Sequence, residues 1–496
     1  MRTDLPTDAD PARLAAYRTL RAVSAEDAYA NLVLPRQLAA ARLTGRDAGL
    51  ATELGYGSLR ARGVLDEVLR RCSSRELAEI EPAVLDLLRL GSYQLLKTRI
   101  PPHAAVATTV DLARVTGNSR ATGFVNAVLR KVAARDFDGW CELIGADASP
   151  LGRLALRYSH PGWIVSAFSD ALAAERSVAL TEEGPVVLAE EGSVALAEAE
   201  LERALAADDA RPETHLVALP GAIERAELAT QAGGSPGPYS PYAVRLTSGG
   251  EPGSLPAIQA GLAAVQDEGS QLCALALLRL PLAGPDERWL DLCAGPGGKS
   301  ALLAAVAAGQ GARLAANELH PHRAELVAAA TRRWPVELLV GDARQLSGSY
   351  DRVLLDAPCT GLGALRRRPE ARWRRTAADL AQLTELQAQL LDAAVQLTRP
   401  GGVLAYVTCS PHLAETARQI EAALTRHPDL ELLDARAAFA GVGQLGAGGT
   451  VLPGADSTAL PGAGSTVPPG AGSTVQLWPH RHGTDAMFFA GLRRGS

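Results

Sequence analysis

The chain lacks the features that mark secreted, membrane-embedded and disulfide-stapled proteins. Its 496 residues contain six cysteines, too few for a disulfide framework, and no Cys-x-x-Cys pair of the kind that binds zinc. No stretch approaches the roughly 20 uninterrupted apolar residues that a membrane span requires, and the amino terminus has no apolar signal core. We therefore expect a reduced cytoplasmic protein with no membrane span and no metal.

The chain also lacks an overall basic charge. Its formal net charge is −6, which gives no chain-wide footprint for nucleic acid. The charge is uneven, however, because residues 1–140 hold 20 Lys and Arg against 16 Asp and Glu, and residues 364–375 hold six arginines. A local basic segment can bind RNA in an acidic protein. The six arginines form either a solvated loop or, with Trp373 among them, a strip that grips phosphates and stacks on a base.

The first 255 residues divide into two patterns. Residues 12–145 repeat apolar side chains at steps of three and four, which predicts an all-helical region. Beyond residue 149 the pattern predicts a small α+β region with strands at 217–219 and 243–246. Its acidic segment at 182–213 is read as a solvated helix or a loop insertion. Its Gly, Pro and Ser-rich residues 232–242 are read as a linker.

Residues 256–435 alternate short apolar strands with helical patterns, which predicts a doubly wound parallel sheet. The strands are expected to start near Trp289, Arg313, Val336, Arg352 and Val403. Residues 453–474 repeat a Pro-Gly-Ala and Ser-Thr unit, so a disordered insertion is expected at about 442–475. Residues 476–478 and 486–492 are expected to close the sheet as strands.

A glycine-rich loop lies between a predicted strand and a predicted helix. Its residues are Cys293, Ala294, Gly295, Pro296, Gly297, Gly298 and Lys299. Glycine lets the backbone approach a ligand closely, and the helix that follows offers free N–H groups to a carboxylate or phosphate. The spacing fits neither the dinucleotide fingerprint nor the ATP-binding phosphate loop. By itself the loop is equally an ordinary strand-to-helix turn.

Acidic residues follow three of the predicted strands: Glu318, Asp342 and Asp356. Ligands of open α/β sheets bind beyond the carboxyl ends of the strands. Glu318 lies 20 residues after Gly298, which suits the two hydroxyls of a ribose, and Asp342 suits the edge of an adenine. Each acid alone is equally a helix cap or a surface residue, but three together favour a nucleotide-like ligand. Arg323 is predicted to join them.

Two cysteines also follow predicted strands, Cys359 in Asp-Ala-Pro-Cys and Cys409 in Thr-Cys-Ser. A thiolate that attacks C6 of a cytosine makes C5 able to take a methyl group. Asp356 is placed to hydrogen-bond or protonate N3, and a base, for which the second cysteine is one candidate, must remove the C5 proton. The pair indicates covalent methyl transfer onto a pyrimidine, with the nucleophile left open by the spacing. Free cysteines more often fill a core, and that is expected of Cys72, Cys141 and Cys273.

These two cysteine motifs resemble those of the Sun (Fmu) RNA cytosine-C5 methyltransferases, and the bacterial small-subunit rRNA branch is the closest match. Three further segments agree with the family, at 265–271, 291–299 and 341–344. Near the amino terminus, three segments resemble the NusB-like helical RNA-binding domain of that branch, at 54–60, 102–106 and 123–130.

The resemblance implies a multi-domain chain. An all-α NusB-like domain is expected at 1–148 and a small α+β region at 149–255. An α/β Rossmann-like methyltransferase domain is expected at 256–496. The resemblance also implies small-subunit rRNA as substrate, rather than DNA, and a monomer.

The same resemblance assigns roles to the predicted site. It implies S-adenosylmethionine as methyl donor, with its methionine end on residues 293–299. Its ribose is expected on Glu318, its adenine near Asp342 and its sulfonium near Asp356. Cys409 is implied as the nucleophile that attacks C6, and Cys359 as the thiol that helps to release the product.

Three positions depart from the family pattern. Ala294-Gly295 replaces the usual Ala-Ala, Glu318 replaces the more usual Asp and lengthens its reach, and residues 215–217 replace a Leu-Arg strand. Two alternatives to an rRNA methyltransferase stay open. One is a non-catalytic RNA-binding or ribosome assembly factor on the same fold, and the other is a methyltransferase of a different nucleic acid.

Overall fold

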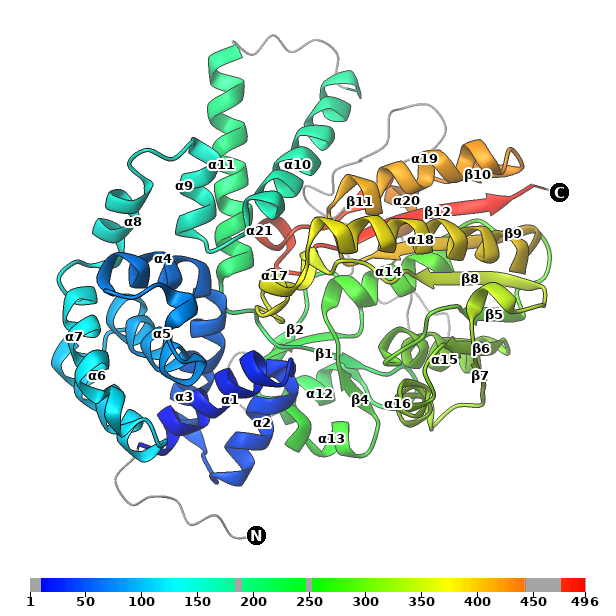
Figure 1. Cartoon of the computed structure of the whole chain (residues 1–496). Coiled ribbons are helices and arrows are strands. Elements are labelled where there is room, and N and C mark those ends of the chain that lie inside the picture. Colours follow the sequence, from blue (N-terminus) through cyan, green and yellow to red (C-terminus); the bar gives the residue numbers. More distant parts are fainter. Residues whose placement is uncertain (1–9, 183–189, 247–251, 441, 443–473, 496) are drawn as a thin grey trace. The chain divides into compact units, whose positions relative to one another are not determined.

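A computed structural model describes residues 10–182, 190–246, 252–440, 442 and 474–495 (Figure 1). Almost all of the insertion predicted at about 442–475 lies outside the described residues. The described chain divides into two compact units. The first takes in 10–166, 209–211 and 365–374, and the second takes in the remainder. The domain boundaries predicted at 148 and 255 stay predictions.

The first unit is helical, which confirms the prediction for 12–145. Its first helix starts at a proline, and Asp10 caps it by accepting a hydrogen bond from the Arg13 backbone N–H at 2.9 Å. The helices are α1 (Pro11–Ala25), α2 (Ala30–Ala40), α3 (Gly45–Arg60), α4 (Arg62–Cys72), α5 (Pro82–Lys97), α6 (Pro102–Val115), α7 (Thr122–Val132), α8 (Phe137–Gly145) and α9 (Pro150–Arg157), with 3-10 turns η1 (Leu77–Glu79) and η2 (Ser119–Ala121). The short helix α17 (Ala371–Arg374) belongs to the same unit.

A small antiparallel sheet with the order β2-β3-β1-β4 lies in the second unit. Its strands are β1 (His215–Ala218), β2 (Gly234–Pro236), β3 (Ala243–Leu246) and β4 (Ala263–Val265). The strands predicted at 217–219 and 243–246 are confirmed to within a few residues. The linker predicted at 232–242 is wrong, because Gly234–Pro236 pairs with β3 as a strand. Gly and Pro there form a hairpin in place of a free connection.

The acidic segment at 182–213 begins where helix α10 (Gly162–Glu182) ends and contains helix α11 (Glu190–Asp209), so most of its described part is helical. Glu200, one of its acids, forms an ion pair with Arg481, which also holds the buried carboxylate of Glu175 at 2.7 Å. This acid is therefore not solvated. Shorter helices of the second unit are α12 (Arg225–Ala232), α13 (Pro256–Gln259) and η3 (Pro252–Ser254).

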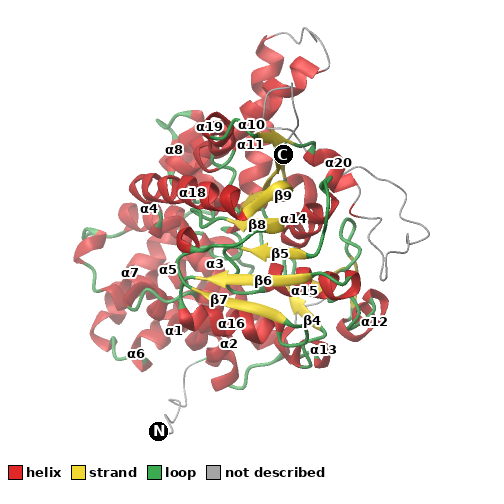
Figure 2. Ribbon diagram, turned by 90° about the vertical axis from the view of Figure 1, so that its right-hand side faces the viewer, coloured by secondary structure: helices red, strands yellow, loops and turns green. Residues whose placement is uncertain are grey.

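The main sheet has the strand order β10-β12-β9-β8-β5-β6-β7, and five neighbouring strands are parallel (Figure 2). The parallel strands are β5 (Arg288–Asp291), β6 (Arg313–Glu318), β7 (Val336–Val340), β8 (Tyr350–Asp356) and β9 (Thr398–Thr408). The closing strands β10 (Leu430–Leu432), β11 (Val475–Gln476) and β12 (Phe488–Arg494) are antiparallel. The predicted α/β fold class is confirmed, with antiparallel strands added at one edge.

Helices cover both faces of this sheet. Helices α14, α15 and α20 lie on one face, and α18 and α19 lie on the other (Figure 2). Their apolar side chains pack against the strands. The helices are α14 (Glu268–Arg279), α15 (Gly298–Gln310), α16 (Pro321–Thr331), α18 (Ala377–Leu397), α19 (Ala417–Arg426), α20 (Ala435–Ala440) and α21 (Pro479–His482), with turns η4 (Ala343–Gln345), η5 (Leu362–Ala364) and η6 (Leu413–Glu415). Among the described residues, no helix is both long and apolar enough to cross a bilayer.

Candidate active site

The predicted site residues gather at the carboxyl ends of β5, β6, β8 and β9, which are neighbours in the sheet. Register explains the gathering, because Asp291 pairs with Leu354 on β8 and Asp356 pairs with Val407 on β9. Residues a few positions beyond these pairs therefore emerge along the same edge.

The glycine-rich loop joins β5 to α15. Its positive φ of 108° at Gly297 suits glycine, and a Cβ there would lie 2.8 Å from the Cβ of Ala330. Asp291, at the end of β5, accepts a hydrogen bond from the Ser300 hydroxyl at 2.6 Å. Burial raises the pKa of Asp291 to about 7. Burial also raises the pKa of the half-buried Cys293 thiol, so this thiol is a poor nucleophile.

Lys299 pairs with the carboxylate of Asp356, with 2.7 Å between Nζ and Oδ2. Burial works against the charged ammonium, but the Asp356 carboxylate outweighs it and raises the pKa of Lys299. The loop lysine thus lies against the acid of the Asp-Ala-Pro-Cys motif. From the family resemblance, Lys299 is expected only at the methionine end of the cofactor.

Glu318, at the end of β6, lies against the glycine-rich loop. Its carboxylate accepts hydrogen bonds from the backbone N–H of Gly295 at 3.1 Å and of His320 at 3.1 Å. Arg323 donates to the Gly295 carbonyl at 2.7 Å and lies 3.5 Å from Glu318. A Cβ on Gly295 would lie 2.1 Å from Glu318 Oε2, which no atom pair tolerates. Gly295 and Glu318 are two of the positions that depart from the family pattern. The Glu318 carboxylate occupies the space that a Cβ at position 295 would need.

Asp342 lies at the end of β7 and caps the turn η4. It accepts a hydrogen bond from the Arg344 backbone N–H at 3.0 Å and pairs with the Arg344 side chain at 2.6 Å. The hydrogen bonds of Arg344 lower the pKa of Asp342. The helix-cap interpretation describes this acid in the structure, and its contact with an adenine stays a prediction.

The two thiols of the predicted pair face each other. Cys359 Sγ and Cys409 Sγ are 3.4 Å apart, and both side chains are partly exposed. The hydrogen bond with Cys409 and then burial raise the pKa of Cys359 well above its ordinary value. Cys359 is therefore a weaker acid than an ordinary cysteine. Cys72, Cys141 and Cys273 are buried, as predicted.

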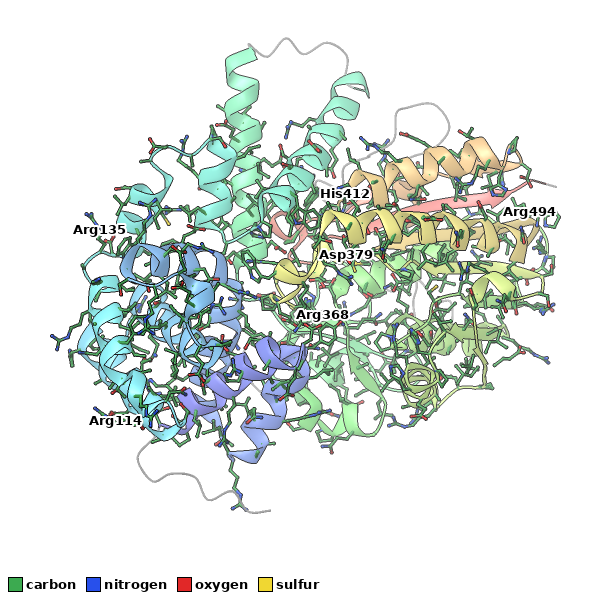
Figure 3. All side chains as sticks on the ribbon, viewed as in Figure 1. Arg114, Arg135, Arg368, Asp379, His412 and Arg494 are labelled. Atoms are coloured by element: carbon green, nitrogen blue, oxygen red, sulfur yellow. The ribbon has the colours of Figure 1, made fainter. Side chains whose placement is uncertain are left out.

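Sequence reasoning missed a buried polar cluster behind the thiols. It consists of Thr360, Gln387, Ser410 and Glu415, all buried. His412, labelled in Figure 3, follows Cys409 and accepts a hydrogen bond from the Ala414 N–H at 3.1 Å, which shapes η6. No local signal identifies such residues, because buried acids and amides look like surface residues in a sequence.

A second missed residue is Gln266, which belongs to the quoted 265–271 segment. Its side chain lies 3.6 Å from the position of a Cβ on Gly298. Its Oε1 atom is buried and has no hydrogen-bond partner in the described protein. An orphaned buried acceptor beside a glycine-rich loop fits a ligand that carries a donor. No group of three potential metal ligands occurs within the described ranges.

Arg372 and Trp373 of the arginine strip fit neither of the two predicted alternatives, and the role of the other arginines stays a prediction. Arg372 is fully buried in the first unit and donates to the carbonyl of Arg60 at 3.3 Å and to Asp209 at 3.0 Å. The indole N–H of Trp373 donates to the Leu59 carbonyl at 3.3 Å. Buried guanidinium groups need such partners, so this segment is structural at Arg372 and Trp373.

Comparisons with known proteins agree on one family. A family model of the 16S rRNA methyltransferase RsmB/F matches residues 280–493, and a NusB family model matches residues 10–134. The fold of the crystal structure of PH0851 is similar, with a TM-score of 0.72 and 20% identity over 99% of this chain and 100% of that one. Fold and matches together define a methyltransferase with a NusB domain.

Relatives specify the family further. The chain is 52% identical over 490 residues to Rv1407 of Mycobacterium tuberculosis (strain ATCC 25618 / H37Rv), whose name gives a methyltransferase without a substrate, and the match covers 98% of this chain and 97% of the relative. It is 31% identical over 428 residues to the probable ribosomal RNA small subunit methyltransferase B of Bacillus subtilis (strain 168), with 84% and 88% covered. The chain belongs to the RsmB/F family of small-subunit ribosomal RNA methyltransferases, as the motifs predicted.

Proposed function

We propose that this protein transfers the methyl group of S-adenosylmethionine to C5 of a cytosine in small-subunit rRNA through a covalent adduct with Cys409. The observation that carries the proposal is the pair of thiols 3.4 Å apart at the carboxyl edge of the sheet. The pKa of one of the pair, Cys359, is raised by the hydrogen bond with Cys409 and by burial. A methyl transfer without covalent catalysis needs no such pair.

The loop residues fit the proposed donor. The N-terminus of α15 offers N–H groups to the carboxylate of its methionine end, and the orphaned Gln266 Oε1 suits its ammonium. Glu318 has one acceptor site left on each oxygen for a ribose, because each accepts one hydrogen bond already. When bound, the donor supplies an electrophilic methyl group. Arg323 and Asp342 stay predictions for this site.

The proposed steps balance on the protein and the base. The Cys409 sulfur bonds to C6, and the electrons of the C5–C6 double bond become available at C5. C5 takes the methyl group as the bond between that group and the donor sulfur breaks, and S-adenosylhomocysteine is the leaving group. Asp356, held by Lys299 at 2.7 Å, stabilises the proton that N3 takes up. A base then removes the C5 proton, the sulfur–C6 bond breaks, and the thiolate leaves. We assign the release step to Cys359.

The test is methyl transfer from tritiated S-adenosylmethionine to unmodified small-subunit rRNA, with transfer RNA and DNA as further substrates. We expect label at cytosine C5, none with Cys409→Ala, and a trapped protein–RNA adduct with Cys359→Ala. Cys141→Ala, a buried cysteine of the first unit, is the matched control. Adduct with Cys409→Ala instead would reverse the two roles. Binding of rRNA without label on any substrate would favour the assembly-factor alternative.

Monomeric state, cytoplasmic location and the absence of DNA binding stay predictions. The middle region and the NusB domain are proposed to contribute RNA contacts.

A further inference from the structure

A buried carboxylate lies directly behind the two thiols. Glu415 is 0% exposed, and its Oε1 accepts a hydrogen bond from the Thr360 backbone N–H at 2.7 Å and from the Gln387 amide at 3.1 Å. Its Oε2 accepts a hydrogen bond from the Thr360 hydroxyl. Within the described residues, no cation pairs with it. Both carboxylate oxygens of Glu415 therefore have hydrogen-bond partners.

These bonds connect Glu415 to the residue that follows each cysteine. Thr360 follows Cys359 and is held directly. The Thr360 hydroxyl also lies 3.3 Å from the Ser410 hydroxyl, and Ser410 follows Cys409. One carboxylate thus links the two turns that carry the thiols.

Further bonds tie the same cluster to the strands below. Tyr406, near the end of β9, donates its hydroxyl to the Glu415 carbonyl at 2.8 Å. Gln387 donates to the Pro358 carbonyl at 2.8 Å, one residue before Cys359. Except for the partly buried Gln387–Pro358 bond, the bonds of this network are buried, where a missing partner is costly. The network therefore fixes the backbone on both sides of the thiol pair.

We propose that Glu415 is a positioning residue that acts through Thr360 and sets the distance between the two thiols, so that Cys359 and Cys409 stay within hydrogen-bond reach of each other. The inference rests on the proposed covalent mechanism for its catalytic meaning. The charged or titratable groups that face Cys359 are Cys409, Glu415 and Asp356. All three oppose loss of its proton, and Glu415 is the one that no step of the reaction uses.

The consequence for catalysis is that Cys359 and Cys409, two chemically identical side chains, take different roles. A thiol that donates a hydrogen bond stabilises a thiolate that accepts it. Within the described residues, the Glu415 carboxylate reaches the Cys409 turn through the Thr360–Ser410 contact. The asymmetry of the pair would thus originate in a residue that contacts neither sulfur.

The experiment measures the alkylation rate of each cysteine against pH by mass spectrometry, alongside single-turnover methyl transfer. Glu415→Gln keeps the shape and removes the charge, and Thr360→Val removes the bridging hydroxyl and keeps the charge. The matched control is Glu421→Gln, an exposed glutamate on α19. We expect Glu415→Gln to lower the alkylation midpoint of Cys359 by about one pH unit. The methyl-transfer rate should fall roughly 10- to 100-fold with the KM for RNA unchanged.

Thr360→Val should slow transfer while leaving the Cys359 midpoint near that of the wild type, and Thr360→Ser should restore the rate. A lower unfolding temperature with an unchanged Cys359 midpoint and an unchanged rate would make Glu415 merely structural and overturn the proposal. If Glu415→Gln does not fold, the comparison of Thr360→Val with Thr360→Ser decides. Equal methyl-transfer rates for these two variants would overturn the positioning role of Glu415. A Cys359 shift in a protein that methylates no RNA would instead refute the proposed function and leave the positioning role intact.

Discussion

The two halves of the candidate site are built in different ways. At the ends of β5 and β6, the loop, Glu318 and Arg323 are joined by bonds between residues 23 and 28 positions apart. At the ends of β8 and β9, the thiols and their supports are joined across 50 and 55 positions. The first half is a local strand–loop–helix–strand unit, whereas the second exists only because β9 pairs with β8 in one register.

The difference suggests a division of function. We call the part at the ends of β5 and β6 the cofactor half and the part at the ends of β8 and β9 the thiol half. The backbone groups and charges of the cofactor half suit the recognition of a charged ligand. Two facing thiols with a buried carboxylate bonded to the adjacent residue suit the reaction itself. Lys299 and Asp356 bridge the two halves, since one residue comes from the loop and the other from the end of β8.

The largest expected effect is a loss of methyl transfer without a loss of donor affinity, on substitution of Cys409. Cys409→Ser should reduce methyl transfer on the order of 10⁴-fold or more, because the nucleophile is lost. Affinity for the donor, measured calorimetrically with S-adenosylhomocysteine, should stay the same. Equal losses of affinity and rate would show that the thiol half also binds the cofactor.

The bridge between the halves comes next. Lys299→Met should slow single-turnover transfer on the order of 10²-fold, because Asp356 loses the ammonium that orients it. Asp356→Asn should cost a similar factor, and the double variant should cost little more than either. Multiplicative losses in this cycle would mean that the two residues act independently.

The cofactor half makes a prediction about size. Gly295→Ala should weaken S-adenosylhomocysteine binding roughly tenfold or more, because its Cβ collides with Glu318 Oε2 at 2.1 Å. Adding Glu318→Asp should restore part of the affinity, since the shorter acid vacates that space. Gly309→Ala on α15, with no atom within 4 Å of the new Cβ, is the control. If the double variant bound S-adenosylhomocysteine no better than Gly295→Ala alone, the proposed contact between positions 295 and 318 would not explain the loss of affinity.

The smallest effect concerns stability. Burial raises the pKa of Asp291 to about 7 in the folded protein, above its unfolded value of about 4. The folded state therefore binds the extra proton, and its stability is highest below the unfolded pKa and falls as the pH rises through 7. Urea midpoints at pH 5 and pH 8 should differ less in Asp291→Asn than in the wild type. Some pH dependence should remain, because Glu175 has its pKa raised to about 7 as well. An identical difference in the variant would contradict this.

The sequence by itself determined the elements and the family. Periodicity of three to four residues predicts the helices of 12–145, and short apolar runs predict β5 to β9, because both patterns depend on neighbours along the chain. The glycine-rich loop and the two cysteine motifs are local as well. Even Gly295 and Glu318 were visible as two departures, although not as one contact.

Only the tertiary structure decided which of these residues meet and which are buried. It paired Lys299 with Asp356, brought the thiols to 3.4 Å, and placed the fully buried Arg372 in the helical unit. It also enclosed Glu415, whose exposure no pattern predicts. The physical reason is that a charged or polar side chain is tolerated in the interior only when distant parts of the chain supply its partners. Strand register and packing fix those partners, and neither can be read from nearest neighbours in the sequence.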